Sequence, residues 1–305
     1  MSKILSLTLF LTLLSSLGNA DGLRVGTWNA EWLYDHKPSK TGVTLERQMS
    51  APNKAEYWQR IKTFAVAINE LDVDFLALQE IEGRHVLKAL AGALRAEFGQ
   101  SYRYAFVEGT DTHTGQDVGL LVREGWTYKP SRFRFDRNAQ QDGRNLSKHL
   151  RVDLSRDGQS YSVVVVHLIT DKKKRLQQAR TLHGWLSKLD NKGLLVMGDF
   201  NTKQKLDQTS QSGDMGTIRG LHTATSKDDL LDSHKKLSQR QTHVSGRELD
   251  RILLSPDLWK RLKKVEVRRK LAIKGSTDDS RQVDYSLPVN KQDLSDHFPL
   301  VAEFK

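Results

Sequence analysis

Eight polar side chains lie at or close to the ends of apolar, strand-like runs, where a folded chain could hold them for chemistry. Glu80, for example, lies two residues after the apolar run Phe75–Leu78, and His167 directly follows a run of four valines. Side chains projected from the ends of rigid strands keep a fixed geometry, which a reactive site requires. The eight residues are Asn29, Glu80, His167, Asp199, Asn201, Asp250, Asp296 and His297.

The acids among these residues predict a bound cation if the fold brings them together. Four carboxylates in one pocket would repel one another, and a divalent cation is the natural neutraliser. Carboxylate and amide oxygens are hard ligands, and the sequence contains no cysteine to compete with them, so Mg²⁺ or Mn²⁺ is favoured over zinc. Each acid alone has an ordinary alternative, because acids after strands commonly form turns or cap helices.

Six ordered blocks resemble the signature blocks of the endonuclease/exonuclease/phosphatase superfamily. That superfamily includes pancreatic-type deoxyribonuclease, abasic-site endonucleases, sphingomyelinases and inositol-phosphate 5-phosphatases. The resemblance implies an α/β (α+β) fold, a four-layered α/β/β/α sandwich of two packed mixed β-sheets flanked by helices, with the site at one edge. The blocks are Thr27-Trp28-Asn29, Leu78-Gln79-Glu80, His167-Leu168, Gly198-Asp199-Phe200-Asn201, Leu249-Asp250-Arg251-Ile252 and Ser295-Asp296-His297-Phe298-Pro299.

The same resemblance implies a metal site. Glu80 matches the primary ligand, Asn29 accompanies it, and Asp296 matches the late metal-site aspartate. Glu31 stands where abasic-site endonucleases often have an aspartate that assists the metal, with a solvent-facing side chain as the alternative.

The catalytic roles are implied in the same way. Asp199 matches the residue that aligns or deprotonates the attacking water, and Asn201 matches its partner at the phosphate. His297 matches the histidine that contacts the scissile phosphate, and Asp250 the carboxylate that orients it. His167 resembles a second histidine, a candidate general acid, and histidine suits both tasks because its pKa lies near physiological pH.

Several further residues stay open between a role at the site and an ordinary solvated position. Asp117 lies where related enzymes hold an acid or arginine close to the site. The others are basic residues that could contact phosphate, namely Arg144, Lys148 and the run Lys172–Arg175.

The net charge of +11 over 305 residues favours a polyanionic partner. Nucleic acid is the commonest polyanion. The net charge and the six blocks together predict a Mg²⁺- or Mn²⁺-dependent nuclease that hydrolyses DNA or RNA. Two alternatives remain: a phosphoesterase acting on lipid or inositol-phosphate headgroups, and a catalytically inactive binding module on the same fold.

Residues 1–20 read as a cleavable signal peptide. Lys3 provides a positive start, the apolar run Ile4–Leu17 follows, and small residues precede Asp21. We therefore expect a secreted or periplasmic protein without a stable membrane anchor, an uncleaved anchor being the alternative, and we expect a monomer. With no cysteine, a disulfide framework is excluded.

Past the signal, strand-like runs alternate with helical patterns, which predicts a single domain over residues 21–305. A capping box at Asn53 and Glu56 starts the first helix, and the polar stretch 203–247 should form long loops around short elements. Further helices are expected over 86–98 and 177–189. Strands are expected over 23–28, 73–78, 102–107, 118–122, 149–154, 161–166, 194–197, 249–254 and 300–304.

Overall fold

The computed structural model describes residues 22–37, 44–111, 113–133, 146–273, 287 and 291–305. The proposed signal peptide and Arg144 lie outside the described residues. Among the helices that are described, none has the length and apolar character needed to cross a membrane.

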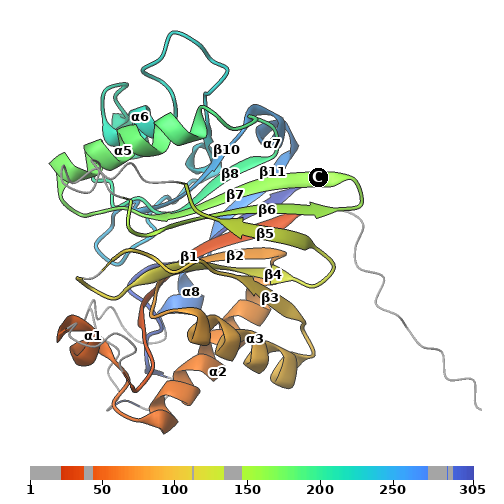
Figure 1. The fold of residues 1–305 in the computed structure, drawn as a ribbon, viewed down its shortest axis with the longest axis vertical. Helices are drawn as coiled ribbons and strands as arrows, with labels where there is room; N and C mark the ends of the chain where they lie inside the picture. The colour runs from red at the N-terminus through yellow and green to blue at the C-terminus, as the bar shows by residue number, and fades with distance from the viewer. Residues whose placement is uncertain (1–21, 38–43, 112, 134–145, 274–286, 288–290) are drawn as a thin grey trace, which may run out of the picture.

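Two six-stranded sheets are the centre of the fold (Figure 1). In the first sheet the strand order is β11 (Leu262–Val267), β12 (Leu300–Phe304), β1 (Arg24–Leu33), β2 (Phe75–Ile81), β4 (Asp117–Arg123) and β3 (Tyr102–Ala105). In the second sheet the order is β5 (Thr127–Ser131), β6 (His149–Arg156), β7 (Gln159–His167), β8 (Leu194–Asp199), β10 (Asp250–Leu254) and β9 (Leu231–Asp232). β1 and β2 are parallel, as are β7 and β8, while the other pairs are antiparallel, so both sheets are mixed.

The helices cover the outer faces of the two sheets (Figure 1). α2 (Lys54–Leu71) and α3 (Arg84–Phe98) pack on the first sheet, and α5 (Lys172–Leu186) and α6 (Asp214–Ile218) pack on the second. The remaining helices are short: α1 (Thr44–Met49), α7 (Pro256–Arg261), α8 (Arg269–Ala272) and the 3-10 turns η1 (Leu206–Gln208) and η2 (Ser233–Lys236). The predicted four-layered sandwich is confirmed.

The four layers follow from strands that are apolar on both faces. In β7, Val163 and Val165 point into the core between the sheets, whereas Val164 and Val166 pack against α5 and α6. Successive strand residues face opposite sides, so an uninterrupted valine run is buried on both.

Local signals predicted some helix boundaries and missed others. Asn53 caps α2, accepting hydrogen bonds from the backbone N–H groups of Ala55 and Glu56. The expected start of the third helix at residue 177 was wrong, because Asp171 caps α5 and the helix begins at Lys172. The first turn of α5 is mostly exposed and charged, so it carries no apolar periodicity that would reveal it.

Five of the described elements were not predicted: α1, β5, α7, β11 and α8. β5 and β11 each lie at one edge of their sheet and are largely half-buried or exposed, so they lack the apolar alternation of a core strand. Within 203–247, the expected short elements are present as η1, α6, β9 and η2.

Two buried histidines make stability depend on pH. Burial lowers the pKa of His149 and of His234 to about 3, and the neighbouring Arg132 and Arg251 guanidinium groups, respectively, add to the effect. The unfolded chain protonates these side chains near pH 6.5 and the folded chain does so only near pH 3, so acidification favours unfolding across that window. Each histidine should remove up to about 1.4 kcal/mol of unfolding free energy per pH unit below ~6.5.

Urea unfolding followed by tryptophan fluorescence between pH 7 and pH 5 measures this dependence. His149→Gln and His234→Gln should each flatten the pH slope, whereas the exposed His222→Gln should leave it unchanged. Equal slopes in all four proteins would contradict the prediction.

Candidate active site

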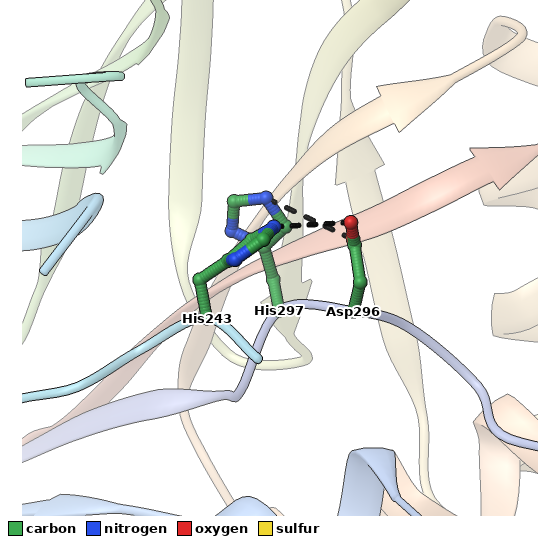
Figure 2. Close-up of side chains that lie close together, drawn as sticks. All are labelled: His243, Asp296 and His297. Atoms are coloured by element: carbon green, nitrogen blue, oxygen red, sulfur yellow. Dashed lines mark hydrogen bonds and ion pairs between the residues drawn. The ribbon is translucent and has the colours of Figure 1, made fainter. Parts of the chain in front are cut away.

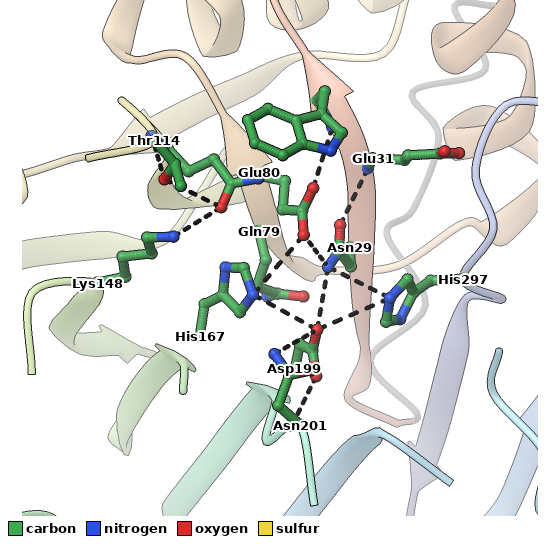
Figure 3. A network of polar contacts seen from close by, with 12 residues as sticks. Asn29, Glu31, Gln79, Glu80, Thr114, Lys148, His167, Asp199, Asn201 and His297 are labelled. Atoms are coloured by element: carbon green, nitrogen blue, oxygen red, sulfur yellow. Dashed lines mark hydrogen bonds and ion pairs between the residues drawn. The ribbon is translucent and has the colours of Figure 1, made fainter. Parts of the chain in front are cut away.

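Strand ends from both sheets meet at the site. Asn29 pairs in register with Gln79, so Asn29 and Glu80 emerge at the same edge of the first sheet. In the second sheet Asp199 pairs with both His167 and Asp250. The register thus places five sequence-predicted residues at neighbouring strand ends. Figure 3 shows four of them, Asn29, Glu80, His167 and Asp199.

The backbone at this edge adopts uncommon conformations. Glu80 and Asn201 have φ values of 57° and 48°, and Glu31 has 42°, all in the left-handed region. Gly198, before Asp199, has φ 144°, and a Cβ there would overlap the carbonyl oxygen of Val166. Left-handed conformations of residues other than glycine cost about 1–3 kcal/mol each and cluster at functional sites.

Asn29 connects the two sheets through its amide group. Its Nδ2 donates to Glu80 Oε1 at 2.9 Å and to Asp199 Oδ2 at 3.1 Å, and lies 3.5 Å from His297 Nε2 (Figure 3). The amide orientation is fixed because Oδ1 accepts the backbone N–H of Glu31 at 3.0 Å. Asn29 therefore presents N–H groups to the carboxylates and holds them together.

His167 faces the same two carboxylates from β7. Its Nε2 lies 3.5 Å from Asp199 Oδ2 and 3.7 Å from Glu80 Oε1. Asn201 supports Asp199, because its backbone N–H donates to Asp199 Oδ1 at 2.8 Å. The amide of Asn201 donates to the carbonyl oxygen of Leu168 at 2.9 Å. The candidate site thus has carboxylate oxygens at its centre.

His297 reaches the centre from the segment before β12. Its Nδ1 lies 2.8 Å from Asp250 Oδ2, and its Nε2 lies 3.7 Å from Asp199 Oδ2. The backbone around His297 is fixed by Ser295, whose hydroxyl donates to the carbonyl oxygen of Asn29 and accepts the His297 N–H. Asp250 is fully buried, so it holds the imidazole ring from the protein side.

Asp296 lies at the rim of this group, beside a histidine that the sequence did not reveal. His243 Nε2 lies 3.1 Å from Asp296 Oδ2, while Asp296 Oδ1 lies 3.9 Å from His297 Nε2 (Figure 2). The rings of His243 and His297 contact edge to face, with centroids 4.6 Å apart. His243 belongs to the polar stretch 203–247, where no apolar pattern singled it out.

The pKa values of three carboxyl groups at the site are raised, as expected where negative charge is not balanced by nearby positive charge. Burial raises the pKa of Asp199 to about 7, and repulsion from Asp250 adds to it. Burial likewise raises the pKa of Glu80, and it raises that of Glu31 well above its usual range with help from Asp296. These acids therefore lack enough positive charge around them.

The two central histidines are shifted in opposite directions. Burial lowers the pKa of His167 well below its usual range, and Lys148 and His297 lower it further. Burial alone would also lower the pKa of His297, but Asp250 and Asp199 outweigh it and raise that pKa well above the usual range. Burial thus favours the neutral form of His167, whereas the two carboxylates favour the cationic form of His297.

Three groups among the described residues could each hold a metal ion: His243 with Asp296 and His297, Glu80 with His167 and Asp199, and Asp199 with Asp250 and His297. Glu31 belongs to none of these groups, but its buried Oε1 has no hydrogen-bond partner among the described residues, and its Oε2 accepts the Asp296 N–H. The raised pKa values and this unpartnered oxygen fit a cation at the site.

The remaining candidates lie in other environments. Lys148 Nζ donates to Gln116 Oε1 at 2.6 Å and lies 3.3 Å from Asp111, close enough to the site to influence His167. Asp117 is buried and accepts the backbone N–H of Gly109 at 2.8 Å. In the basic run, Arg175 is buried against Asp214, while residues 172–174 are exposed at the start of α5.

Comparisons with known proteins agree with this architecture. The Endonuclease/Exonuclease/phosphatase family model matches residues 26–297. No curated protein has a sequence that matches significantly. The fold is similar to D. rerio TDP2 complexed with single strand DNA product, at 16% identity and TM-score 0.57, covering 93% of this chain and 99% of that one.

Two further solved structures share the fold. The human Nocturnin catalytic domain has 18% identity and TM-score 0.56, with 93% of this chain and 94% of that chain covered. An endonuclease/exonuclease/phosphatase family protein from Bacteroides thetaiotaomicron has 18% identity and TM-score 0.55, with 93% and 97% covered. These likenesses and the family match confirm the resemblance drawn from the six blocks.

Proposed function

The chain belongs to the endonuclease/exonuclease/phosphatase family, and on that premise we propose that it is a divalent-metal-dependent phosphodiesterase that acts as a nuclease. One observation carries the proposal: Asn29, Glu80, His167, Asp199 and His297, which are far apart in the sequence, lie within hydrogen-bond or ion-pair range of shared partners. Acids, amides and histidines so arranged suit in-line attack of water on a phosphodiester.

Glu80 would hold the ion, with Asp296 and Asn29 at its sides. Asn29 would serve as an oxygen ligand beside these acids only after its amide turns over, because Nδ2 and not Oδ1 now faces Glu80 and Asp199. When bound, Mg²⁺ or Mn²⁺ neutralises charge on a phosphate oxygen. Asn29 in its present orientation still aligns the carboxylates of Glu80 and Asp199.

The other side chains divide the work on the phosphodiester. Asp199 aligns the attacking water and takes its proton. The cationic His297, oriented by Asp250, and the amide of Asn201 stabilise the negative charge that grows on the phosphate. His167 Nε2 lies beside the carboxylates of Asp199 and Glu80. His167 would act as the general acid at the leaving oxygen only after gaining a second ring proton, because a neutral imidazole that gave up its one N–H proton would become an anion.

Metal removal provides the first test. EDTA should reduce cleavage of plasmid DNA or RNA to the level of the buffer, since the acids at the site would lose their neutralising cation, and added Mg²⁺ or Mn²⁺ should restore it. Ca²⁺ is a useful comparison because it prefers more ligands and longer distances. Full activity in EDTA after extensive dialysis would refute metal dependence.

The preference for nucleic acid is supported by the net charge of +11 and by a structural neighbour, TDP2, whose structure contains single strand DNA. If phosphate contacts supply the affinity, log K for a labelled oligonucleotide should fall linearly with log salt concentration. Fluorescence anisotropy measured at salt concentrations from about 50 to 200 mM tests this loss of affinity. A flat response would argue against polynucleotides.

A substrate panel separates the nuclease from its alternatives. Plasmid DNA, RNA, sphingomyelin and an inositol polyphosphate are assayed with the same metal. Hydrolysis of the lipid or inositol substrate alone would replace the nuclease proposal by a headgroup phosphoesterase. Binding of nucleic acid without hydrolysis of any substrate would indicate an inactive binding module.

We also propose that the protein is exported after cleavage behind Ala20 and acts as a monomer. N-terminal sequencing of the mature protein and light scattering test these two points. An intact N-terminus starting at Met1 in the exported fraction would contradict cleavage.

A further inference from the structure

His243 is a partly buried histidine beside the candidate site, and the chemistry proposed above gives it no role. Its side chain is 13% exposed, and it contacts both the Asp296 carboxylate and the His297 ring (Figure 2). Its backbone pairs with that of His297 in an isolated antiparallel bridge. The backbone N–H of Val244 donates to the Asp296 carbonyl oxygen at 2.9 Å, and that of Phe298 to the Thr242 carbonyl oxygen at 2.7 Å.

The tautomer of His243 follows from its other neighbour, Ser245. The backbone N–H of Ser245 donates to His243 Nδ1 at 2.9 Å, and the Ser245 hydroxyl lies 2.7 Å from the same nitrogen. A backbone N–H can only donate, so Nδ1 is an acceptor and the ring proton lies on Nε2. His243 Nε2–H therefore donates to Asp296 Oδ2 at 3.1 Å.

This tautomer argues against His243 as a metal ligand. A ligating imidazole offers one nitrogen lone pair to the ion and donates the other ring N–H to a neighbour. In His243, Nε2 faces Asp296 and carries the proton, whereas Nδ1 faces Ser245 and accepts a hydrogen bond. Although His243, Asp296 and His297 are close enough to surround an ion, the hydrogen bonds assign His243 to Asp296.

Asp296 is held by hydrogen bonds of both its backbone and its side chain. Its backbone N–H donates to Glu31 Oε2 at 2.8 Å, its carbonyl oxygen accepts from Val244, and its Oδ2 accepts from His243. With Oδ2 engaged, Oδ1 is the oxygen that turns toward His297 Nε2, 3.9 Å away. The His243 contact thus selects which carboxylate oxygen faces the catalytic group.

We propose that His243 is a positioning residue that orients the Asp296 carboxylate for the divalent cation, through the donated Nε2–H. The proposal rests on the metal-dependent function proposed above. Outer partners of metal-binding carboxylates typically change metal affinity by about 10–100-fold when removed. His243 should therefore act chiefly on metal affinity, and less on the rate at saturating metal.

Two substitutions separate the donated hydrogen bond from the ring. His243→Phe keeps an aromatic ring against His297 and removes the donor, whereas His243→Gln has an amide long enough to donate to Asp296. Mn²⁺ binding to the EDTA-treated full chain is measured from the free-ion EPR signal, beside the Mg²⁺ dependence of cleavage. The Glu80→Gln variant measures Mn²⁺ binding when the proposed primary ligand is removed. The matched control is His222→Phe, because His222 is an exposed histidine whose ring contacts that of His183 edge to face.

We expect His243→Phe to weaken Mn²⁺ binding about 10–100-fold, with His243→Gln within a few fold of the wild type. Wild-type Mn²⁺ affinity in His243→Phe, or a Gln variant as weak as Phe, would overturn the proposal. Loss of kcat at saturating metal with unchanged Mn²⁺ affinity would overturn it too. Should His243→Phe not fold, His243→Asn, too short to reach Asp296, takes its place.

The same titration separates this inference from the proposed function. If the wild type and the Glu80→Gln variant bind Mn²⁺ equally, the ion does not bind at Glu80, and the proposed function is then wrong as well. If the wild type binds more tightly than Glu80→Gln and His243→Phe binds like the wild type, only the role of His243 is wrong.

Discussion

Asp199→Asn should lower kcat by about 10²–10⁴-fold at saturating Mg²⁺ while the protein stays folded. Asparagine has the shape of aspartate but cannot accept a proton from water. Its NH₂ group would also face the amides of Asn29 and Asn201, which now donate to Asp199 Oδ2 at 3.1 and 3.3 Å. The variant therefore loses both the base and the oxygen that organises the pocket.

The effect of Asp199→Asn on stability should be small because two contributions oppose each other. Two hydrogen bonds to the carboxylate are lost, but so is a buried acid whose pKa burial raises to about 7. We expect the midpoint of thermal unfolding to change by only a few degrees. Steady-state cleavage of a labelled oligonucleotide and circular dichroism melts measure both quantities.

Asp157→Asn is a matched control for the removed charge. Asp157 is 91% exposed in a turn with φ 50°, a conformation that asparagine tolerates well. This variant should keep wild-type activity. If Asp199→Asn retained activity within tenfold of the wild type, Asp199 would not be the residue that activates water.

His297→Ala should lower kcat by about 10²–10³-fold, because the cation that faces the phosphate is removed. The same substitution leaves Asp250 Oδ2 without the 2.8 Å contact to His297 Nδ1, and Asp250 Oδ1 already has no hydrogen-bond partner among the residues that the structure describes. A fully buried carboxylate without its partner is unfavourable, so His297→Ala should also lower the unfolding free energy by about 1–3 kcal/mol.

The double variant His297→Ala with Asp250→Asn tests how the pair works. If Asp250 acts only by orienting His297, adding Asp250→Asn to His297→Ala should cost little further activity. It should also recover part of the lost stability, because the buried charge is gone. Exposed His222→Ala provides the control for loss of an imidazole. Independent, multiplying losses from the two substitutions would contradict a joint role.

Much of the fold was predictable because its signals are local. The four valines before His167 marked a strand buried on both faces, which requires a layer on each side. Asn53 marked the start of α2 because a side-chain oxygen there satisfies free backbone N–H groups. The edge strands β5 and β11 were missed because an edge position needs no apolar pattern.

Some features of the candidate site depended on contacts between distant segments. His243 contacts Asp296 only because its backbone pairs with that of His297. The amide of Asn29 presents N–H groups to the pocket because the Glu31 N–H occupies its oxygen, a preference that residue type could not reveal. The suggested assisting residue Glu31 proved to be buried beside Asp296.

The sequence by itself determined which chemical groups are present and which strand ends carry them, because side-chain type, alternation and capping act over a few residues. The tertiary structure alone decided which groups share partners and which charge each one bears. Burial lowers the pKa of His167, whereas Asp250 and Asp199 raise that of His297. Desolvation and Coulomb interactions depend on distances in space, and here the chain sets those distances by pairing strands that are far apart in the sequence.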